Sequence, residues 1–475
     1  MLDIPEPCLP DGALERFAAI VGPAHALTEV ADTEPFAADQ RGLLSGRTPL
    51  VLKPGGVEEV SAILRLANEL RVPVVPQGGN TGLVGAGVPR RGEAEVVVAL
   101  GRMDRILDVD ADGYTMTVEA GCILQRAQEA ADAADRLFPL SLGAKGTAQI
   151  GGNIATNAGG TGVLAYGNTR DLVMGVEAVL PSGEVFGHLS RLRKDNTGYD
   201  IANLFVGAEG TLGIVTKAVL KLFPKPKGRE VAFAALASPR AALDLFNRAR
   251  DAAGFGLTAF ELISARAMDI TVDFTGMRRP TEAAPWYVLA EISSGRSAED
   301  ARDMMEGILV AAIEAGVVDD AVLAQSLTQQ ADFWRMREDM SWAQKPLGAS
   351  IKHDISVPVG AIPAFIEEAD KAVERVCPGA RIVNFGHMGD GNLHYNVSRP
   401  TDWEDGPFID LYEAMNDAVY AVVHAHDGSM SAEHGIGQVK RDRLAHLKAG
   451  TRIETMRALK RLFDPNGIMN PGKVV

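Results

Sequence analysis

Apolar residues along the first half of the chain follow two alternating periods, one typical of strands and one typical of helices. Residues 57–70 have helical spacing, with apolar Val60, Ile63, Leu64 and Ala67, and an alanine-rich segment predicts a second helix over 122–134. Short apolar runs predict strands at 50–52, 72–76, 96–100, 116–118, 176–180 and 214–216. This mixture indicates an α/β or α+β fold and excludes a helical bundle.

A break in this pattern at 223–228, Phe-Pro-Lys-Pro-Lys-Gly, predicts a linker, because two prolines and a glycine continue neither a helix nor a strand. Beyond it, strands are predicted near 231–234 and 286–290, and helices over 239–252 and 298–315. A softer break near 424–429 precedes a basic helix over 452–462. We therefore expect one domain over 1–225, a second over 226–425, and a C-terminal segment, 426–475, that returns to the first.

Glycine changes this picture, since 50 of the 475 residues are glycine and the excess is clustered. The clusters lie near 78–87, 143–167, 207–213, 386–391 and 428–437. Clustered glycine marks backbone that approaches a ligand closely or adopts a positive φ.

The first cluster contains Gly-Gly-Asn-Thr-Gly at 78–82, directly after a predicted strand. It lacks the Gly-Xaa-Gly-Xaa-Xaa-Gly spacing and opens no helix, so a Rossmann site is excluded and specificity for NAD is disfavoured. Successive backbone N–H groups in such a loop can still bind an anion. Taken alone, this loop would be a glycine-rich turn.

Charge and cysteine content narrow the class of protein. With 47 Lys and Arg against 62 Asp and Glu, the net charge is −15, which argues against nucleic acid as the main partner. No apolar stretch reaches the ~18 residues of a membrane span. Cys8, Cys122 and Cys377 are too scattered for a disulfide scaffold or a thiolate metal site, and they fit a reducing compartment. The first residues show no basic region ahead of an apolar core, so we expect no signal peptide and a cytoplasmic location.

The segment 143–167 is poor in charge and rich in glycine, small hydroxyl and amide side chains, a composition that suits a loop laid along a pyrophosphate and a flat ring. Residues 207–214, Gly-Ala-Glu-Gly-Thr-Leu-Gly-Ile, have a similar glycine-rich composition and precede a predicted strand. Together with 78–82, these segments resemble the FAD-binding domain of flavoproteins of the vanillyl-alcohol-oxidase type, also called the PCMH type. The resemblance implies an α+β fold: this FAD-binding domain in 1–225, an α/β substrate or cap domain with an antiparallel sheet in 226–425, and a small helical C-terminal segment.

The same resemblance implies where FAD binds. The first loop carries Asn80 and no nearby histidine, so we expect FAD to be bound non-covalently. The residues expected to bind it are Pro76, Gly78, Gly79, Asn80, Thr81, Gly82, Leu83, Gly143, Gly146, Gly151, Gly152, Asn153, Thr156, Asn157, Gly160, Tyr166, Gly167, Glu209, Gly210, Gly213, Ile214 and Asn470.

Two histidines and a glutamate form a candidate metal site. Asp390-Gly391 between alternating runs predicts a two-residue hairpin turn, which would place His387 and His394 directly opposite each other with Cβ atoms ~5 Å apart. Glu433 in Ser-Ala-Glu-His-Gly-Ile-Gly is a candidate third ligand. Two histidines and a carboxylate leave an open position, as at catalytic zinc, although manganese or iron would also fit. The alternative is that these histidines are hydrogen-bonded structural residues.

Gly-His-Xaa-Gly-Asp-Gly-Asn-Xaa-His at 386–394 and Ser-Ala-Glu-His-Gly-Xaa-Gly at 431–437 resemble the C-terminal halves of FAD-linked D-2-hydroxyacid dehydrogenases, most closely the D-2-hydroxyglutarate dehydrogenases. The resemblance implies that His387, His394 and Glu433 bind a divalent metal, with zinc the first expectation. It also implies that Asn396 contacts the substrate and that His434 binds it and is the catalytic base. A metal on the 2-hydroxyl lowers its pKa, a neutral histidine takes the proton, and the hydride on C2 passes to flavin N5.

Three further residues are candidates for substrate choice. Residues 334–341 predict a helix on which Arg337 and Ser341 share a face, and Lys352 precedes a short predicted strand. Alone, such residues are usually solvated surface groups. In the D-2-hydroxyglutarate dehydrogenases an arginine, a hydroxyl residue one turn later and a lysine before Asp-Xaa-Ser-Xaa-Pro hold the distal carboxylate of a diacid, and these three residues have that spacing.

We therefore expect an enzyme that oxidises D-2-hydroxyglutarate to 2-oxoglutarate and passes electrons to an acceptor such as an electron-transferring flavoprotein or a quinone. One alternative is the same chemistry on a monocarboxylate such as D-lactate or glycolate. Another is a flavin-binding electron-transfer subunit without its own substrate site. A homodimer is left open by the sequence.

Overall fold

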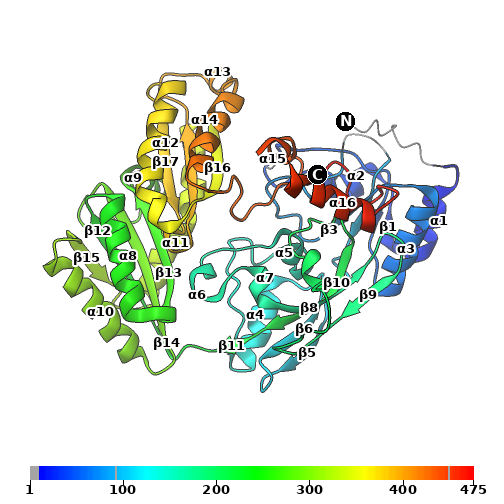
Figure 1. The fold of residues 1–475 in the computed structure, drawn as a ribbon, viewed down its shortest axis with the longest axis horizontal. Coiled ribbons are helices and arrows are strands. Elements are labelled where there is room, and N and C mark those ends of the chain that lie inside the picture. The colour runs from blue at the N-terminus through cyan, green and yellow to red at the C-terminus, as the bar shows by residue number, and fades with distance from the viewer. Residues whose placement is uncertain (1–9, 91–93, 448–449) are drawn as a thin grey trace. The chain divides into compact units, whose positions relative to one another are not determined.

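The computed structural model describes residues 10–90, 94–447 and 450–475, which form two compact units (Figure 1). Unit 1 is made of the described residues of Met1–Gly159, Asn168–Pro224 and Glu433–Val475. Unit 2 is made of Gly160–Gly167 and Lys225–Ala432. The chain thus passes between the units inside the predicted linker and again at Ala432–Glu433, and the last segment belongs to unit 1. Cys8 lies outside the described residues, whereas Cys122 and Cys377 are buried free thiols.

A small mainly parallel sheet forms the first half of unit 1. Its strand order is β1-β2-β4-β3, in which β2 and β3 both run parallel to the central strand β4. The strands are β1 (Ala26–Leu27), β2 (Val51–Leu52), β3 (Val74–Gln77) and β4 (Val96–Ala99). Helix α3 (Val57–Leu70) connects β2 to β3, and its four predicted apolar positions are all buried in the core against this sheet.

An antiparallel sheet forms the second half of unit 1, in the order β5-β6-β10-β8-β9. Its strands are β5 (Ile106–Asp110), β6 (Thr115–Glu119), β8 (Val173–Val179), β9 (Val185–His188) and β10 (Ile214–Lys221), and a two-stranded ribbon joins β7 (Arg136–Leu137) to β11 (Phe223–Pro224). The other helices of unit 1 are α1 (Ala13–Val21), α2 (Val30–Thr33), α4 (Leu124–Ala133), α5 (Ile150–Thr156), α7 (Thr169–Leu172), α15 (Arg441–Leu447) and α16 (Thr451–Phe463).

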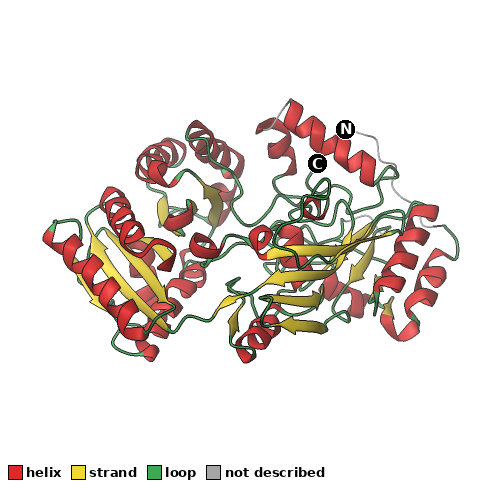
Figure 2. Ribbon diagram, turned by 60° about the horizontal axis from the view of Figure 1, so that its bottom comes forward, coloured by secondary structure: helices red, strands yellow, loops and turns green. Residues whose placement is uncertain are grey.

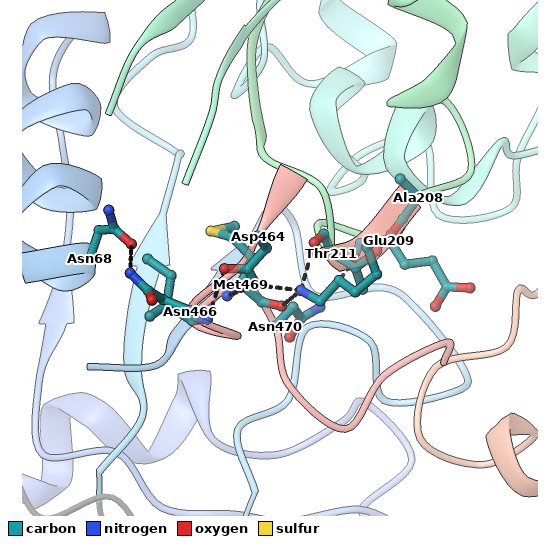
Figure 3. Close-up of polar contacts among 10 residues, drawn as sticks. Asn68, Ala208, Glu209, Thr211, Asp464, Asn466, Met469 and Asn470 are labelled. Carbon is teal, nitrogen blue, oxygen red and sulfur yellow. Dashed lines mark hydrogen bonds and ion pairs between the residues drawn. The ribbon is translucent and has the colours of Figure 1, made fainter. Parts of the chain in front are cut away.

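The C-terminal segment extends the parallel sheet beyond β3. Met469 pairs with Val74 as a parallel bridge, and the backbone of Val74 exchanges hydrogen bonds with Ile468 and Asn470, each 2.8 Å long. Asp464 holds this segment in place, since its carboxylate accepts hydrogen bonds from the backbone N–H groups of Ile468 and Met469 (Figure 3). Strand β3 leads into the 78–82 loop. Because of this bridge it has a hydrogen-bonded neighbour on each side, β4 on one and the C-terminal segment on the other.

Unit 2 is built on a seven-stranded antiparallel sheet in the order β15-β12-β14-β13-β17-β18-β16. The strands are β12 (Gly228–Leu236), β13 (Leu257–Ser264), β14 (Trp286–Ser294), β15 (Asp320–Leu323), β16 (Ser350–Ser356), β17 (Arg381–Gly386) and β18 (Asn392–Ser398). The helices are α6 (Val163–Tyr166), α8 (Pro239–Ala253), α9 (Ala265–Thr275), α10 (Ala298–Glu314), α11 (Leu327–Ala343), α12 (Ile362–Val376), α13 (Asp405–Ile409) and α14 (Tyr412–Ala425).

Helices cover both faces of this sheet (Figure 2). On one face, α9 and α11 pack against a core that includes Ile263, Phe385 and Met336. On the other, α8 and α10 cover β12 and β14, while α12 and α14 cover β16 and β18. Because β12, β13 and β14 are covered on both sides, almost all their side chains are buried and the strands have continuous apolar runs rather than alternation.

The structure confirms the predicted α+β class and corrects three local predictions. The 223–228 segment is not a simple linker, because Phe223–Pro224 pairs with β7 and Gly228 opens β12. The 143–167 segment is partly helical, since α5 and α6 lie within it. Lys352 lies inside β16 rather than before it. No helix among the described residues is long and apolar enough to span a membrane.

Candidate functional site

A cavity of about 280 Å³ lies within unit 1 where the glycine-rich segments meet. Glu433 and His434 line this cavity as well. The predicted cofactor residues that line it are Pro76, Gly78, Gly79, Asn80, Thr81, Gly82, Leu83, Gly143, Gly151, Gly152, Asn153, Thr156, Glu209, Gly210, Gly213 and Ile214. Three other predicted cofactor residues, Gly160, Tyr166 and Gly167, belong to unit 2. The remaining three, Gly146, Asn157 and Asn470, lie in unit 1 outside the lining.

The glycines around the cavity serve two purposes. At Gly82, Gly143 and Gly152, an added Cβ would meet nothing within 4 Å, so these positions leave open space that a side chain would fill. At Gly79, a Cβ would lie 2.0 Å from the carbonyl oxygen of Thr147, and at Gly151 it would lie 2.7 Å from Ala120 Cβ. The first group makes room for a ligand, whereas the second lets two backbone segments pack closely.

Two buried acceptors suit the cavity to a polar ligand. Gln149 and Asn153 both line the cavity, and their buried side-chain oxygens have no hydrogen-bond partner in 10–90, 94–447 or 450–475. A buried acceptor without a partner costs about 1–3 kcal/mol, so a ligand with N–H or O–H donors would be stabilised here. FAD has such donors in its ring N–H and its ribityl hydroxyls, and the space at the glycines gives room for the cofactor.

Glu209, in the cavity wall, is hydrogen-bonded to the loop that carries Glu433 and His434. Its backbone has φ 50°, the left-handed region that side chains rarely adopt, and its N–H donates to the Ala155 carbonyl at 2.7 Å. Its carboxylate accepts the backbone N–H groups of Ile436 at 2.7 Å and Gly437 at 2.8 Å. Burial raises the pKa of Glu209, and these two donors oppose that shift. The main chain of Glu209 is held from the other side by Asn470, whose amide donates to its carbonyl at 2.7 Å (Figure 3).

In unit 2, four candidate residues lie on one face of the sheet. Strand pairing places Asp354 opposite His394 and Lys352 opposite Asn396. Residues directly opposite in an antiparallel pair share a face. The pairing of Phe385 with both His394 and Ile263 shows that this is the face covered by α11.

The two histidines are close together, but in a different way from the prediction. Strands β17 and β18 pair Phe385, not His387, with His394, so the predicted two-residue turn is wrong. Residues 387–391 form the connection, with a 3₁₀ turn at Met388–Asp390 that ends at Gly391 in the left-handed region (φ 90°). A Cβ at Gly391 would lie 2.3 Å from the Val357 carbonyl oxygen, so packing requires glycine here. The rings of His387 and His394 still lie 5.4 Å apart between centroids.

Glu261 on β13 joins two of the predicted site residues. Its Oε1 lies 2.7 Å from His387 Nδ1, and its Oε2 accepts the Arg337 Nε–H at 2.7 Å. Burial alone would raise the pKa of Glu261, but His387 and Arg337 outweigh it and hold the pKa at about 2. The ionised carboxylate only accepts, so His387 Nδ1 carries the proton and Nε2 is the ring nitrogen suited to a metal.

The three predicted substrate residues differ in exposure. Arg337 is buried, and its guanidinium lies 4.8 Å from the centre of the Phe385 ring. Within the described part of the chain, its Nη2 has no hydrogen-bond partner. Ser341 and Lys352 are exposed.

Sequence reasoning missed Glu261 and Asp354. Glu261 stands within Leu-Thr-Ala-Phe-Glu-Leu-Ile-Ser, and an acid in an apolar strand is a signal that could have been used. Asp354, which is buried, accepts a hydrogen bond of 2.9 Å from the Asn392 amide. Its alternation with Lys352 along β16 was the available signal.

Family models match both parts of the chain. Residues 48–187 match an FAD binding domain, and residues 225–474 match the C-terminal domain of FAD linked oxidases. Among solved structures, p-cresol methylhydroxylase with substrate bound has a TM-score of 0.77 at 15% identity, covering 98% of this chain and 96% of that one. This likeness shows the PCMH-type fold alone.

Curated relatives match almost the whole chain. A mitochondrial D-2-hydroxyglutarate dehydrogenase of Arabidopsis thaliana is 38% identical over 97% of this chain and 80% of its own length. A D-2-hydroxyglutarate dehydrogenase of Xanthomonas citri is 38% identical over 94% of this chain and 93% of its own. A putative mitochondrial D-lactate dehydrogenase of Schizosaccharomyces pombe is 37% identical over 94% and 86%. With the cavity, the family models and these near-full-length relatives in agreement, this chain belongs to the FAD-linked D-2-hydroxyacid dehydrogenases with a vanillyl-alcohol-oxidase-type FAD-binding domain.

Proposed function

We propose that this enzyme oxidises D-2-hydroxyglutarate to 2-oxoglutarate with the help of FAD and a divalent metal. The observation that carries the proposal is the buried group of Arg337, Glu261 and His387, with the half-buried His394 beside it, on one side of the unit 2 sheet. It combines a cation for a distal carboxylate with two imidazoles that suit a metal. The names of the Arabidopsis and Xanthomonas relatives support the same substrate.

We assign the metal to His387, His394 and Glu433. The orientation of His387 by Glu261 is the arrangement that metal-binding histidines usually have. Glu433 directly follows Ala432, whose backbone N–H donates to the Asp354 carbonyl at 3.4 Å. Two imidazoles and a carboxylate favour zinc, and manganese or iron are the alternatives.

In this mechanism, Arg337 binds the distal carboxylate, and Ser341 and Lys352 add donors to it. Asn396, on the same sheet face as His394, contacts the substrate near its reacting carbon. His434 takes the proton from the 2-hydroxyl as a neutral base. When bound, the metal would supply Lewis acidity and FAD would supply a hydride acceptor.

The second candidate is the same reaction on a monocarboxylate such as D-lactate or glycolate. The name of the Schizosaccharomyces relative favours it. A buried arginine with an unpartnered Nη2 favours the diacid, because a monocarboxylate would leave that donor without a partner. The intact His387, His394, Glu433 and His434 set argues against a subunit without its own site.

An anaerobic visible spectrum tests the proposal. Adding D-2-hydroxyglutarate to the purified enzyme should bleach the flavin band, and prior treatment with EDTA should abolish this bleaching until zinc is restored. Bleaching by D-lactate and not by the diacid would favour the second candidate. Arg337→Ala and Lys352→Ala should lose turnover on the diacid while sparing D-lactate, and an equal loss on both substrates would count against diacid recognition.

We also propose an electron-transferring flavoprotein or a quinone as electron acceptor, on the basis of family resemblance. A cytoplasmic location is proposed from the scattered cysteines, of which Cys122 and Cys377 are free thiols. Acceptor competition with the purified enzyme and fractionation of the source cells test these two points.

A further inference from the structure

Glu261 is a carboxylate inside an apolar strand of a sheet covered on both faces. It is 1% exposed, and its neighbours along β13 are apolar and buried. An ionised carboxylate in such surroundings is strongly disfavoured unless it is paired and hydrogen-bonded. Its two partners therefore explain how it can be charged here.

Each carboxylate oxygen of Glu261 is hydrogen-bonded to a different residue. Oε1 accepts from His387, in the connection between β17 and β18, and Oε2 accepts from Arg337, on α11. These residues are 126 and 76 positions away along the chain. Since each oxygen is used once, moving the carboxylate toward one partner weakens its bond to the other.

We propose that Glu261 is a positioning residue that couples the metal ligand His387 to the diacid-binding Arg337. The inference rests on the proposed function of those two residues and deepens it. Glu261 fixes the His387 tautomer so that Nε2 presents its lone pair, and it fixes Arg337 over Phe385 with Nη2 available for the distal carboxylate. Both oxygens of its own carboxylate are engaged by these two residues.

This coupling gives the site a means of selecting diacids. A substrate with a distal carboxylate would be held by Arg337 at that end, and at its hydroxyl end by the metal that His387 would help to bind. Glu261 sets the distance between these two attachment points, so they are placed before the substrate arrives. A monocarboxylate uses only one of them.

The test compares Glu261→Gln with a matched control. Glutamine keeps the shape but replaces one acceptor oxygen by an NH₂ donor, so it cannot serve both partners. Glu230 is the control, because it is also a buried glutamate of this sheet and lies 3.8 Å from an arginine, Arg302. FAD-loaded, EDTA-stripped proteins are titrated with zinc against a chromophoric chelator.

We expect Glu261→Gln to bind zinc about 10–100-fold more weakly than wild type, and Glu230→Gln to bind it unchanged. With zinc saturating, Glu261→Gln should raise KM for D-2-hydroxyglutarate more than it lowers kcat. If wild type binds zinc and oxidises the diacid while Glu261→Gln matches it in both measurements, the role of Glu261 is overturned. If wild type itself neither binds zinc nor oxidises the diacid, the proposed function is overturned, independently of the role of Glu261.

A measurement on the unmodified enzyme covers the case in which Glu261→Gln does not fold. The ¹⁵N chemical shifts of the His387 ring, assigned by comparison with His387→Gln, report its tautomer in the metal-free enzyme. The proposal requires the proton on Nδ1. A proton on Nε2 would overturn it whatever the variant does.

Discussion

Lys473 is a buried lysine near the C-terminus, 1% exposed, whose ammonium has no hydrogen-bond partner among the residues that the structure describes. Burial lowers its pKa from 10.5 to about 8; Glu95 opposes the shift, and Arg90 and Arg441 add to it. The unfolded chain therefore binds more protons than the folded one between pH 8 and 10.5. Lys473 costs stability in full below pH 8, and this cost disappears as the pH rises through 10.5.

Replacing this charge should stabilise the protein in a pH-dependent way. We expect Lys473→Met to raise the free energy of unfolding at pH 7 by up to about 3 kcal/mol, and the difference from wild type to shrink toward pH 10. Urea unfolding midpoints at both pH values measure it. Lys194→Met, at an exposed lysine, is the control and should show no such trend. An equal gain at both pH values would contradict the assignment to charge burial.

The individual site residues show how far sequence reasoning reaches. His387, His394, Asn396 and Arg337 could be named because they stand in recognisable local patterns. Glu261 could not be assigned a role, because its partners are 76 and 126 positions away and only the sheet order brings them together. Local sequence patterns identify the proposed metal and substrate residues, whereas a residue that contacts two of them from a distant strand is found only from the tertiary structure.

Helix α5 carries part of the cavity wall, and its two adjacent glycines face different surroundings. A Cβ at Gly151 would lie 2.7 Å from Ala120 Cβ, whereas one at Gly152 would meet nothing within 4 Å. We expect Gly151→Ala to destabilise the protein by about 1–3 kcal/mol through overpacking and to weaken FAD binding by displacing α5. Gly152→Ala should keep or raise thermal stability, as alanine favours helices, and still weaken FAD binding because its methyl group occupies the cavity.

Thermal unfolding of the flavin-free proteins and FAD titration by flavin fluorescence separate the two effects. Gly307→Ala in α10 is the control, since a Cβ there also meets nothing within 4 Å and Gly307 lies in unit 2. It should gain stability and leave FAD affinity unchanged. Equal behaviour of the Gly151 and Gly152 variants would refute the distinction between a packing glycine and a cavity glycine.

Helices and strands could be predicted where the spacing of apolar residues along the sequence is regular. Helix α3 has its predicted bounds, 57–70, because its apolar stripe is long and regular. Helix α5 was missed, because Ile-Gly-Gly-Asn-Ile-Ala-Thr has low helix propensity and its helix depends on close packing against the end of β6. The predicted pairing of His387 with His394 was wrong for a similar reason. Gly391 is glycine because the Val357 carbonyl packs closely against it, and not because it stands in a two-residue turn.

Unit 1 is completed by residues that follow unit 2 in the sequence. Its first residues build the parallel sheet, unit 2 intervenes, and Glu433–Val475 then returns to pair with β3. A boundary inside the 223–228 segment and a returning C-terminal segment were expected from the sequence. The association of Gly160–Gly167 with unit 2 was not, because Leu164 packs against Gly389, more than two hundred positions away, and no local pattern encodes that contact.

The returning segment should therefore control the flavin cavity through Asp464. Besides the backbone N–H groups of Ile468 and Met469, its carboxylate accepts from Lys460 Nζ at 2.5 Å, and Lys460 also donates to the Thr211 carbonyl at 2.8 Å. In Asp464→Asn, an NH₂ group faces at least one of these donors, a loss of about 1–3 kcal/mol. The Val74–Met469 bridge and the 78–82 loop after β3 should loosen with it, so we expect weaker FAD binding and a lower midpoint of thermal unfolding.

Asn466→Ala is the matched control for this last change, because Asn466 lies in the same turn and its side-chain amide donates a 2.8 Å hydrogen bond to Asn68 (Figure 3). It should lose at most about 1 kcal/mol and keep its FAD affinity. Flavin release on dilution, measured for both variants beside wild type, gives the comparison. If Asp464→Asn held FAD as tightly as Asn466→Ala, the pairing of β3 with the C-terminal segment would stabilise unit 1 without shaping its cavity.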